Sequence, residues 1–542
     1  MRESWVGVIS SAVTDDRVSQ SSSLVRRGIH VELTAPFQHA YPEGMSTRRV
    51  MGIETEYGIA VPGDPRANPM AASGEVVTTY ARAHGLRAAH GAWDYSDEHP
   101  LVDARGFEVP RARADLSQLT DIEDPTLANV VLANGARLYV DHAHPEYSSP
   151  EVTSPRAAVV WDRAGELVMR EVVTRLAESG RPINLYKNNT DGKGASYGTH
   201  ENFLVSRQTP FDRIVTGLTP FFVARQVMCG AGRVGIGQES EHVGYQISSR
   251  SDFFEAPVGL ETTFKRPIIN TRDEPHADPD VWRRLHVIIG DANQADVANL
   301  LKVGSTSLVL AMIEAGEVDR SFEVLHPVEA LKVISHDPTC RATVRMRDGR
   351  DLTAVEILGH YLERARSFVE REGSDPATDE VLAQWERVLG LLAGDPMEAV
   401  ADIDWVAKLG LLQRYRDRDG LAWGDPRLTA IDIQFSDVRP DKGIFHKLEA
   451  AGRITRLTTE DEVRSAVSTP PEDTRAWLRG RTVETLGDHV VSASWDSLVL
   501  RLPRAGRVAR LPLTDPLAHG RAETDALLTA GDVDDLVSAL GA

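Results

Sequence analysis

A β-strand with two acidic residues on one face is predicted by the segment Arg48-Arg-Val-Met-Gly-Ile-Glu-Thr-Glu-Tyr-Gly-Ile-Ala60. Glu54 and Glu56 stand two positions apart, and side chains two apart on a strand point to the same face. Gly52 and Gly58 allow another backbone or a ligand to approach closely. We therefore expect this strand to carry part of a polar site.

Two further predicted strands alternate in the same way and carry a polar pair each, namely His200 with Asn202 and Arg284 with His286. One such pair usually marks only the solvent side of a strand. Carboxylates and imidazoles that converge from several strands, however, suit Mg²⁺ or Mn²⁺. Arg284 and Asn202 are side chains of the kind that bind phosphate oxygens beside such a metal.

A fourth strand is predicted over residues 136–141 and ends at Asp141, with His142, His144 and Glu146 following. A carboxylate in this place suits a nucleophile, or a base that activates water. The alternative is an aspartate that ends a strand and caps the next turn. The residues alone leave both interpretations open.

The remaining pattern predicts a mixed α+β chain with a mostly helical second half. Ser154 and Pro155 are typical of a helix start, and that helix is expected to end near Gly180. A capping box of Thr353 and Glu356 starts another helix. Further helices are predicted at 76–83, 126–134, 294–315, 327–334, 353–370, 380–392 and 396–416, and further strands at 244–249, 265–271, 431–435 and 494–502. The glycine-rich stretches 192–194 and 230–237 match neither a P-loop nor a dinucleotide fingerprint.

Three parts are expected along the chain. Residues 1–47 are interpreted as a disordered leader or a start-site artefact, 48–425 as the main domain, and 426–542 as a small C-terminal domain. Residues 91–121 show neither helical nor strand periodicity, and a loop of that length is usually functional or disordered.

Composition limits the classes of function. The formal net charge is −20 and hydrophobic residues make up 42%, which favours a water-soluble globular protein and disfavours a nucleic-acid-binding surface built on overall charge. Cys229 and Cys340 are far apart and lack zinc-site spacing, so we expect a reducing cytoplasm. No long apolar run or signal-peptide core is present, so neither a membrane span nor secretion is expected.

The chain resembles the family of Pup ligases and Pup deamidases/depupylases, which act on the small protein tag Pup. The resemblance runs from about Arg48 almost to the C-terminus. It rests on ordered strings that include Gly52-Ile-Glu-Thr-Glu-Tyr-Gly58, Asn134-Gly-Ala-Arg-Leu-Tyr-Val-Asp-His-Ala-His-Pro-Glu-Tyr-Ser148, Tyr186-Lys-Asn-Asn-Thr-Asp191, Ser196-Tyr-Gly-Thr-His-Glu-Asn202, Asn270-Thr-Arg-Asp-Glu-Pro-His-Ala-Asp278 and Arg283-Arg-Leu-His-Val-Ile-Ile-Gly-Asp-Ala-Asn293.

This resemblance implies a fold like the carboxylate–amine ligases related to glutamine synthetase. A curved antiparallel β-sheet would cradle Mg²⁺ and ATP or ADP, helices would back it, and a small α+β domain would follow. Asp141 would be the catalytic carboxylate. The metal ligands would be Glu56, Glu146, His200 and His286, and the nucleotide-binding residues Glu54, Thr55, Glu56, Tyr57, Gly58, Ser148, Ser149, Asn202 and Arg284.

Two family activities have to be separated. The ligase joins the C-terminal glutamate of Pup to a target lysine and consumes ATP. The deamidase converts a C-terminal glutamine of Pup to glutamate and also hydrolyses the Pup–lysine isopeptide bond, with nucleotide bound but not consumed. An insertion like 91–121 near the active site and the string Val140-Asp-His-Ala-His-Pro-Glu146 resemble the deamidase, which we favour over the ligase.

The deamidase interpretation carries further expectations. Asp141 would either attack directly, forming an anhydride, or activate water. The partners would be Pup and pupylated proteins, with a functional link to a bacterial proteasome. Because Pup is acidic, a local basic groove is expected, for which Arg439, Lys442, Lys447 and Arg453 are candidates. A non-catalytic binding protein and a small-molecule glutamate–amine ligase are the rival interpretations.

Overall fold

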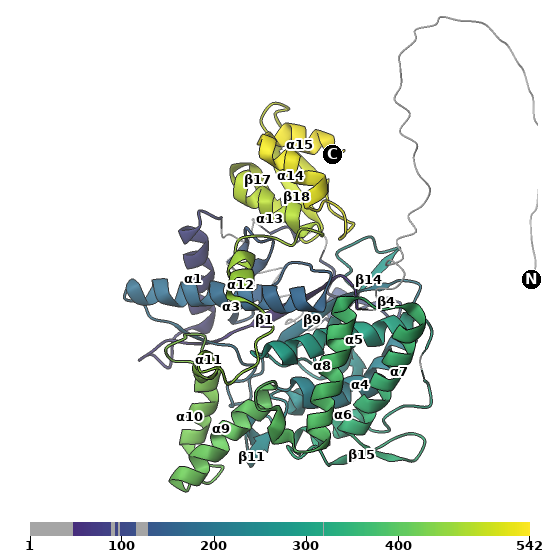
Figure 1. Cartoon of the computed structure of the whole chain (residues 1–542). Coiled ribbons are helices and arrows are strands. Elements are labelled where there is room, and N and C mark those ends of the chain that lie inside the picture. Colours follow the sequence, from purple (N-terminus) through teal and green to yellow (C-terminus); the bar gives the residue numbers. More distant parts are fainter. Residues whose placement is uncertain (1–46, 88–92, 96–97, 115–127, 318, 542) are drawn as a thin grey trace, which may run out of the picture. The chain divides into compact units, whose positions relative to one another are not determined.

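The computed structural model describes residues 47–87, 93–95, 98–114, 128–317 and 319–541 (Figure 1). The predicted leader, except Thr47, and parts of the 91–121 segment lie outside these residues. At the centre of the fold is a six-stranded antiparallel sheet in the order β14-β9-β1-β7-β6-β5. In chain order its strands are β1 (Met51–Glu56), β5 (Asn129–Val131), β6 (Arg137–Asp141), β7 (His144–Ser148), β9 (Thr199–Ser206) and β14 (Trp282–Val287). The predicted α+β class is confirmed.

One face of this sheet is apolar and packs on helices. Alternate residues of its strands, such as Ile53, Phe203 and Val140, are buried in hydrophobic clusters. Helices α1 (Pro69–Ala83), α3 (Pro155–Glu178) and α5 (Asp296–Glu314) contact these strands. Because side chains alternate along a strand, burying this face leaves the other set of side chains together on the opposite face.

A helical layer extends the apolar core. Figure 1 shows α4 (Phe211–Cys229), α5, α7 (Ala354–Glu372) and α8 (Pro376–Ala393) side by side, and they contact one another. Helices α6 (Pro327–Ser335) and α9 (Asp404–Asp419) bury residues in the same cluster. Among the described residues, α5 is the one helix long and apolar enough to cross a bilayer, but 94% of that stretch is buried inside the fold. It is a core helix.

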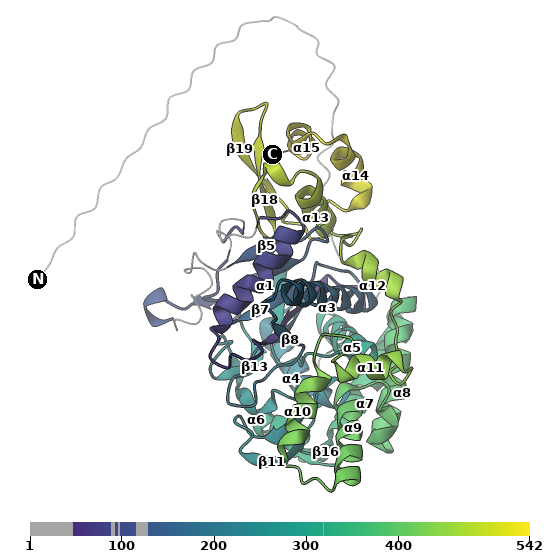
Figure 2. The ribbon, with the colours of Figure 1, turned by 90° about the vertical axis from the view of Figure 1, so that its left-hand side faces the viewer.

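The C-terminal elements share a second hydrophobic cluster, which also takes in Trp93 and Val131 of β5. Helices α13 (Ala476–Thr485), α14 (Arg521–Ala530) and α15 (Val533–Ala539) pack with β17 (Val490–Ala493), β18 (Ser497–Leu502) and β19 (Arg507–Pro512), as Figure 2 shows. By contrast, α10 (Pro426–Phe435) and α11 (Ile444–Ala450) bury Phe435 and Phe445 in the main core. The domain boundary at residue 426 stays a prediction, because packing among the described residues changes near Ala476.

Most predicted elements are present within a few residues, and both predicted helix caps are confirmed. The Ser154 side chain accepts a hydrogen bond from the Ala157 N–H, and Thr353 with Glu356 forms the capping box. The remaining elements are β2 (Gly58–Ala60), β3 (Val102–Asp103), β4 (Phe107–Glu108), β8 (Asn184–Tyr186), β10 (Arg233–Ile236), β11 (His242–Gln246), β12 (Phe254–Gly259), β13 (Arg266–Asn270), β15 (Thr343–Arg345), β16 (Asp351–Thr353) and α12 (Glu460–Ala466).

Three predicted elements are wrong in type or extent. The helix expected over 126–134 contains strand β5, because Val130 and Val131 complete a ladder with β6 that no local pattern reveals. The strand expected over 431–435 lies inside α10, whose start is fixed by the N-cap Asp425 and by Pro426. The helix expected over 396–416 is a short 3₁₀ turn followed by α9.

Candidate active site

The strand register collects polar side chains on the face of the sheet that the helices leave uncovered. Glu54 of β1 pairs with His200 of β9 on one side and with Ser148 of β7 on the other. Glu56 pairs with Glu146. Directly paired residues of antiparallel strands share a face, so the predicted convergence of the polar strand faces is confirmed.

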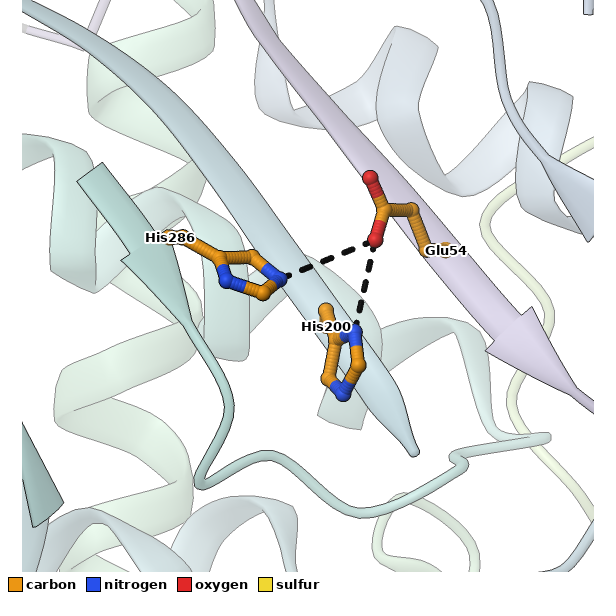
Figure 3. A group of neighbouring side chains, drawn as sticks. All are labelled: Glu54, His200 and His286. Atoms are coloured by element: carbon orange, nitrogen blue, oxygen red, sulfur yellow. Dashed lines mark hydrogen bonds and ion pairs between the residues drawn. The ribbon is translucent and has the colours of Figure 1, made fainter. Parts of the chain in front are cut away.

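Glu54, His200 and His286 form a first cluster (Figure 3), in which one ligand atom of each lies within 4.8 Å of the others. The Nδ1 atom of His200 is 3.3 Å from Glu54 Oε2, and the Nε2 atom of His286 is 3.8 Å from it. Asn202 donates a 2.8 Å hydrogen bond to the other carboxylate oxygen. Three strands, β1, β9 and β14, therefore present one carboxylate and two imidazoles to one point.

The electrostatics of this cluster suit a metal ion. Burial lowers the pKa of His286 to about 3, so its imidazole is neutral at physiological pH. Burial alone would raise the pKa of Glu54, but hydrogen bonds from His200 and His286 lower it well below its usual value. An ionised carboxylate beside a neutral imidazole is the protonation state that metal binding requires.

Glu56, Asp141 and Glu146 form a second cluster, again within 4.8 Å of one another. Glu56 accepts a hydrogen bond from the Gly198 N–H and lies 3.2 Å from His144 Nδ1. Both carboxylate oxygens of Glu146 are buried, and no described residue meets hydrogen-bond geometry with them.

Without a bound cation, the buried carboxylate of Glu146 destabilises the folded protein. Burial, together with the charges of Asp141, Glu54 and Glu56, raises the pKa of Glu146 well above its usual value, and the neighbouring Tyr139 hydroxyl offsets only part of that shift. Carboxylates this close repel one another when ionised. A hard divalent cation removes this repulsion and accepts the buried oxygens as ligands, so the donor set fits Mg²⁺.

Two cavities adjoin these clusters. The first, of about 70 Å³, is lined largely by apolar atoms of β1 and β9 and by Ser148, Ser149 and Arg475. The second, of about 110 Å³, is lined by Glu54, His200 and His286 of the first cluster and by Asp141 and Glu146 of the second. Both cavities are lined by Glu54, His276, Arg284 and Trp495. A largely apolar pocket that shares charged lining residues with a neighbouring cavity suits a nucleotide base with its phosphates beside a metal.

The predicted site residues divide into those that line one of the two cavities and those that do not. Asn202 and Arg284 join the site, with Arg284 Nη1 donating to Asn202 Oδ1 at 2.7 Å. Those that line a cavity are Glu54, Asp141, Glu146, Ser148, Ser149, Asn202, His200, Arg284 and His286. Glu56 lies in the second cluster, and Glu54 takes the place beside the histidines that the resemblance gave to Glu56.

Thr55, Tyr57 and Gly58 do not present side chains to the cavities. Thr55 belongs to the opposite strand face, and Tyr57 is buried in the cluster with α1. A Cβ atom on Gly58 would lie 2.4 Å from the Tyr197 hydroxyl, so a tight contact requires glycine here. That these residues contact the nucleotide stays a prediction, and only their backbone atoms could make such a contact.

Several lining residues were missed by sequence reasoning. Arg137 and Tyr139 precede Asp141 on β6 by four and two positions, so the period-two rule that selected the other residues would have found them. Arg475 and Trp495 come from the C-terminal elements, and no local signal connects them with the sheet.

The described part of the 91–121 segment lies beside the second cavity, which Glu98 and Pro100 line. The Trp93 indole N–H donates to Glu98 Oε1 at 2.7 Å, and the Arg137 guanidinium lies 3.9 Å from the Trp93 ring. The segment is therefore in contact with strand β6, four positions from Asp141.

The predicted basic groove is partly neutralised by its own neighbours. Arg439 pairs with Asp437 at 2.5 Å, and Lys442 is 3.4 Å from Asp441. Lys447 and Arg453 are exposed. The groove stays a prediction.

Comparison with known proteins identifies relatives of the whole described fold. A family model described as Pup-ligase protein matches residues 49–499. The chain is 56% identical over 498 residues to a depupylase of Acidothermus cellulolyticus, which covers 91% of this chain and 99% of the relative. It is 50% identical over 488 residues to a Pup deamidase/depupylase of Mycolicibacterium smegmatis, covering 90% and 98%.

Solved structures of a Pup ligase are also similar. The complex of the prokaryotic ubiquitin-like protein Pup with its ligase PafA matches with a TM-score of 0.73 and 33% identity, over 90% of this chain and 93% of that one. The ligase PafA in complex with ADP matches with a TM-score of 0.68 and 34% identity, over 78% and 95%.

Proposed function

The chain belongs to the Pup-ligase protein family, and we propose that it is the hydrolase of that family. It deamidates the C-terminal glutamine of Pup to glutamate and cleaves the isopeptide bond between Pup and a target lysine. The relative at 56% identity is named a depupylase and the one at 50% a Pup deamidase/depupylase, whereas the ligase structures share 33–34%. The higher identity favours hydrolysis.

The observation that carries this proposal is the position of Asp141. Its carboxylate lies in a cavity beside Glu146, within 4.8 Å of two other carboxylates whose donor set fits Mg²⁺. A carboxylate held beside a cation site can act on an amide carbonyl that enters the same cavity.

Two reaction routes follow from this geometry. In the first, Asp141 attacks the side-chain carbonyl carbon of Pup's terminal residue, the C–N bond breaks as the nitrogen takes a proton from water, and ammonia or the lysine amine leaves a mixed anhydride. Water then hydrolyses the anhydride and returns the free Asp141. In the second, Asp141 takes a proton from a water molecule that attacks the same carbon and passes it to the nitrogen, and the C–N bond breaks to release ammonia or the lysine amine. Neither route transfers a phosphoryl group, so nucleotide is not consumed.

Metal and nucleotide have separate places in the proposal. The predicted ligands fall into the two clusters, so His200 and His286, with Glu54 beside them, would hold one Mg²⁺, and Glu56 with Glu146 would hold another beside Asp141. The bound ion would supply positive charge to the developing oxyanion. The first cavity, with Ser148, Ser149, Asn202 and Arg284, would take ATP or ADP, as the ADP complex of the related ligase supports.

The proposed partners are Pup and pupylated proteins, with a functional link to a bacterial proteasome and a cytoplasmic location. Support for Pup as partner comes from the names of the relatives and from the complex of Pup with the related ligase. Arg439, Lys442, Lys447 and Arg453 remain candidates for contacts to this acidic tag.

The ligase is the second candidate, because the solved ligase structures share the fold over most of the chain. Incubation with glutamate-ended Pup, ATP and a lysine-bearing target separates the two. A covalent conjugate would establish ligation, whereas we expect none.

The test of the proposal is mass spectrometry of glutamine-ended Pup after incubation with Mg²⁺ and a non-hydrolysable ATP analogue. We expect the mass change that accompanies replacement of the amide nitrogen by oxygen. Asp141→Asn should reduce the rate by more than about 10³-fold, because the reacting carboxylate is lost. Nucleotide affinity should change by less than about threefold, since Asp141 does not line the first cavity. Full activity of the variant would refute the role of Asp141.

A further inference from the structure

The hairpin turn between β6 and β7 contains a residue in an unfavourable backbone conformation. Asp141 pairs with His144, so His142 and Ala143 form a two-residue loop. Two-residue hairpins favour a positive φ at the first loop position, which Gly, Asn or Asp usually occupies. Here it is His142, with a φ of 50°. An L side chain in this region is strained relative to glycine, and such strain at an active site is a reason to look for a function of the side chain.

The turn does not need the imidazole to form. The Ser73 hydroxyl of α1 donates to the Ala143 carbonyl at 2.8 Å, and the Tyr57 N–H donates to the Pro145 carbonyl at 3.0 Å. The ladder between β6 and β7 continues through five residue pairs up to the turn. The backbone is therefore fixed by contacts that a glycine at position 142 would keep.

The imidazole of His142 instead contacts the reacting carboxylate. Its Nδ1 atom lies 2.7 Å from Asp141 Oδ1, and the Asp141 side chain is only 14% exposed. In the tautomer that carries the hydrogen on Nδ1, the imidazole donates this hydrogen bond to the carboxylate oxygen. Both side chains line the second cavity. This charge-assisted hydrogen bond limits rotation of the Asp141 carboxylate.

The hydrogen bond opposes a repulsion within the second cluster. Glu56 and Glu146 each place an oxygen within 4.8 Å of Asp141, and like charges at that distance push a flexible side chain away. The same turn places His144 Nδ1 3.2 Å from Glu56. Of these contacts, the one from His142 to Asp141 meets hydrogen-bond geometry, whereas His144 Nδ1 and both oxygens of Glu146 have no hydrogen-bond partner among the described residues.

We propose that His142 is a positioning residue for the hydrolytic reaction: its Nδ1–H holds the Asp141 carboxylate in one orientation toward the cavity, and this contact is why a histidine occupies a turn position that favours glycine. The inference rests on the proposed function, because it concerns how Asp141 reaches the amide carbonyl. His142 itself touches neither substrate nor nucleotide in this role.

The test compares two substitutions that both accept a positive φ. His142→Gly keeps the turn and removes the hydrogen bond, whereas His142→Asn keeps the turn and supplies an amide N–H near the position of Nδ1. For glutamine-ended Pup we expect His142→Gly to lower kcat by about 10–100-fold, the usual effect of losing an orienting contact. KM and nucleotide affinity should stay within about threefold, because ground-state binding is unaffected. His142→Asn should recover most of the lost kcat.

A matched control separates the imidazole from the backbone conformation. His519 has a φ of 62° and lines neither cavity of the site, so His519→Gly should leave kcat unchanged. If His142→Gly keeps a wild-type kcat while Asp141→Asn is inactive, the inference falls and the proposed function stands. Equal losses in the Gly and Asn variants, or a loss confined to KM, would also overturn it. A wild-type protein without hydrolytic activity, or an active Asp141→Asn variant, would overturn the proposed function and this inference together.

Discussion

At the scale of single residues, Glu146 lowers the stability of the metal-free protein. Glu146 is 1% exposed, its pKa is raised well above the usual value, and none of the described side chains pairs with either of its oxygens in hydrogen-bond geometry. A buried group left in this state destabilises the fold unless a ligand completes it. Glu146 is thus better explained by a bound cation than by packing.

Replacement of Glu146 should therefore separate stability from metal binding. We expect Glu146→Gln to raise the free energy of unfolding of the metal-free protein by about 1–3 kcal/mol, because a neutral amide removes the charge repulsion. The variant should lose the increase in Tm that Mg²⁺ gives the wild type. Thermal denaturation with and without Mg²⁺ measures both effects, and a Mg²⁺ shift equal to that of the wild type would exclude Glu146 as a ligand.

Among the secondary-structure elements, close contact between helix α3 and the sheet depends on one small residue. A Cβ atom on Gly165 of α3 would lie 2.3 Å from Cδ1 of Tyr147 on β7. Tyr147 is buried, and its hydroxyl accepts a hydrogen bond from Asn134 at 3.0 Å. The ring cannot shift without disturbing the strand that carries Glu146.

The same substitution at two helix glycines should have opposite effects. Gly165→Ala should destabilise the protein by about 1–3 kcal/mol, because overpacking outweighs the better helix propensity of alanine. Gly390→Ala in α8 should stabilise it by roughly 0.5–1 kcal/mol, because no described atom beyond the adjoining turns of the helix lies within 4 Å of the added Cβ. Chemical denaturation measures both, and an equal gain at both sites would show that α3 has room to move.

Across the whole molecule, a buried ion cluster joins the C-terminal elements to the end of the central sheet. Glu151, three residues after β7, accepts a 2.8 Å hydrogen bond from Arg475 Nε and is also paired with Arg479. Arg479 further donates to the Gly135 carbonyl. Arg475 lines the first cavity together with Trp495. The wall of the proposed nucleotide site therefore depends on this cluster.

The free energy of unfolding should depend on pH through the protonation of Glu151. Burial would raise its pKa, but Arg479 and Arg475 outweigh burial and lower it to about 2. Because this value lies below the roughly 4.3 expected in the unfolded chain, the contribution is fully present above pH ~4.3 and decreases as the pH falls toward 2. Chemical denaturation of the wild type and of Glu151→Gln over this range measures the free energy of unfolding of each. The difference between the two free energies should shrink as the pH falls.

At neutral pH, Glu151→Gln should cost about 3–5 kcal/mol, because two buried arginines lose their carboxylate. It should also weaken ADP binding, since Arg475 loses its support. Glu460→Gln is the control. Its pair with Arg464 is exposed, so the loss should stay below about 1 kcal/mol. A similar small loss at both positions would mean that the buried cluster does not hold the C-terminal elements in place.

The polar strand faces were readable from the sequence because they follow from a local rule. Glu54 with Glu56, His200 with Asn202, and Arg284 with His286 stand two apart, and a strand turns such pairs to one side whatever surrounds it. The errors arose where the local rule competes with distant partners, as in β5, whose two valines become strand only by pairing with β6.

By itself, the sequence determined the α+β class, the family and the set of acids and imidazoles, since these depend on residue identity and short-range periodicity. The tertiary structure alone decided that Glu54 joins the histidines, that Glu56, Asp141 and Glu146 form a separate group, and that Trp495 and Arg475 close the first cavity. Those outcomes depend on strand register and on packing between segments far apart in the chain. Such contacts form only when the whole apolar core is assembled.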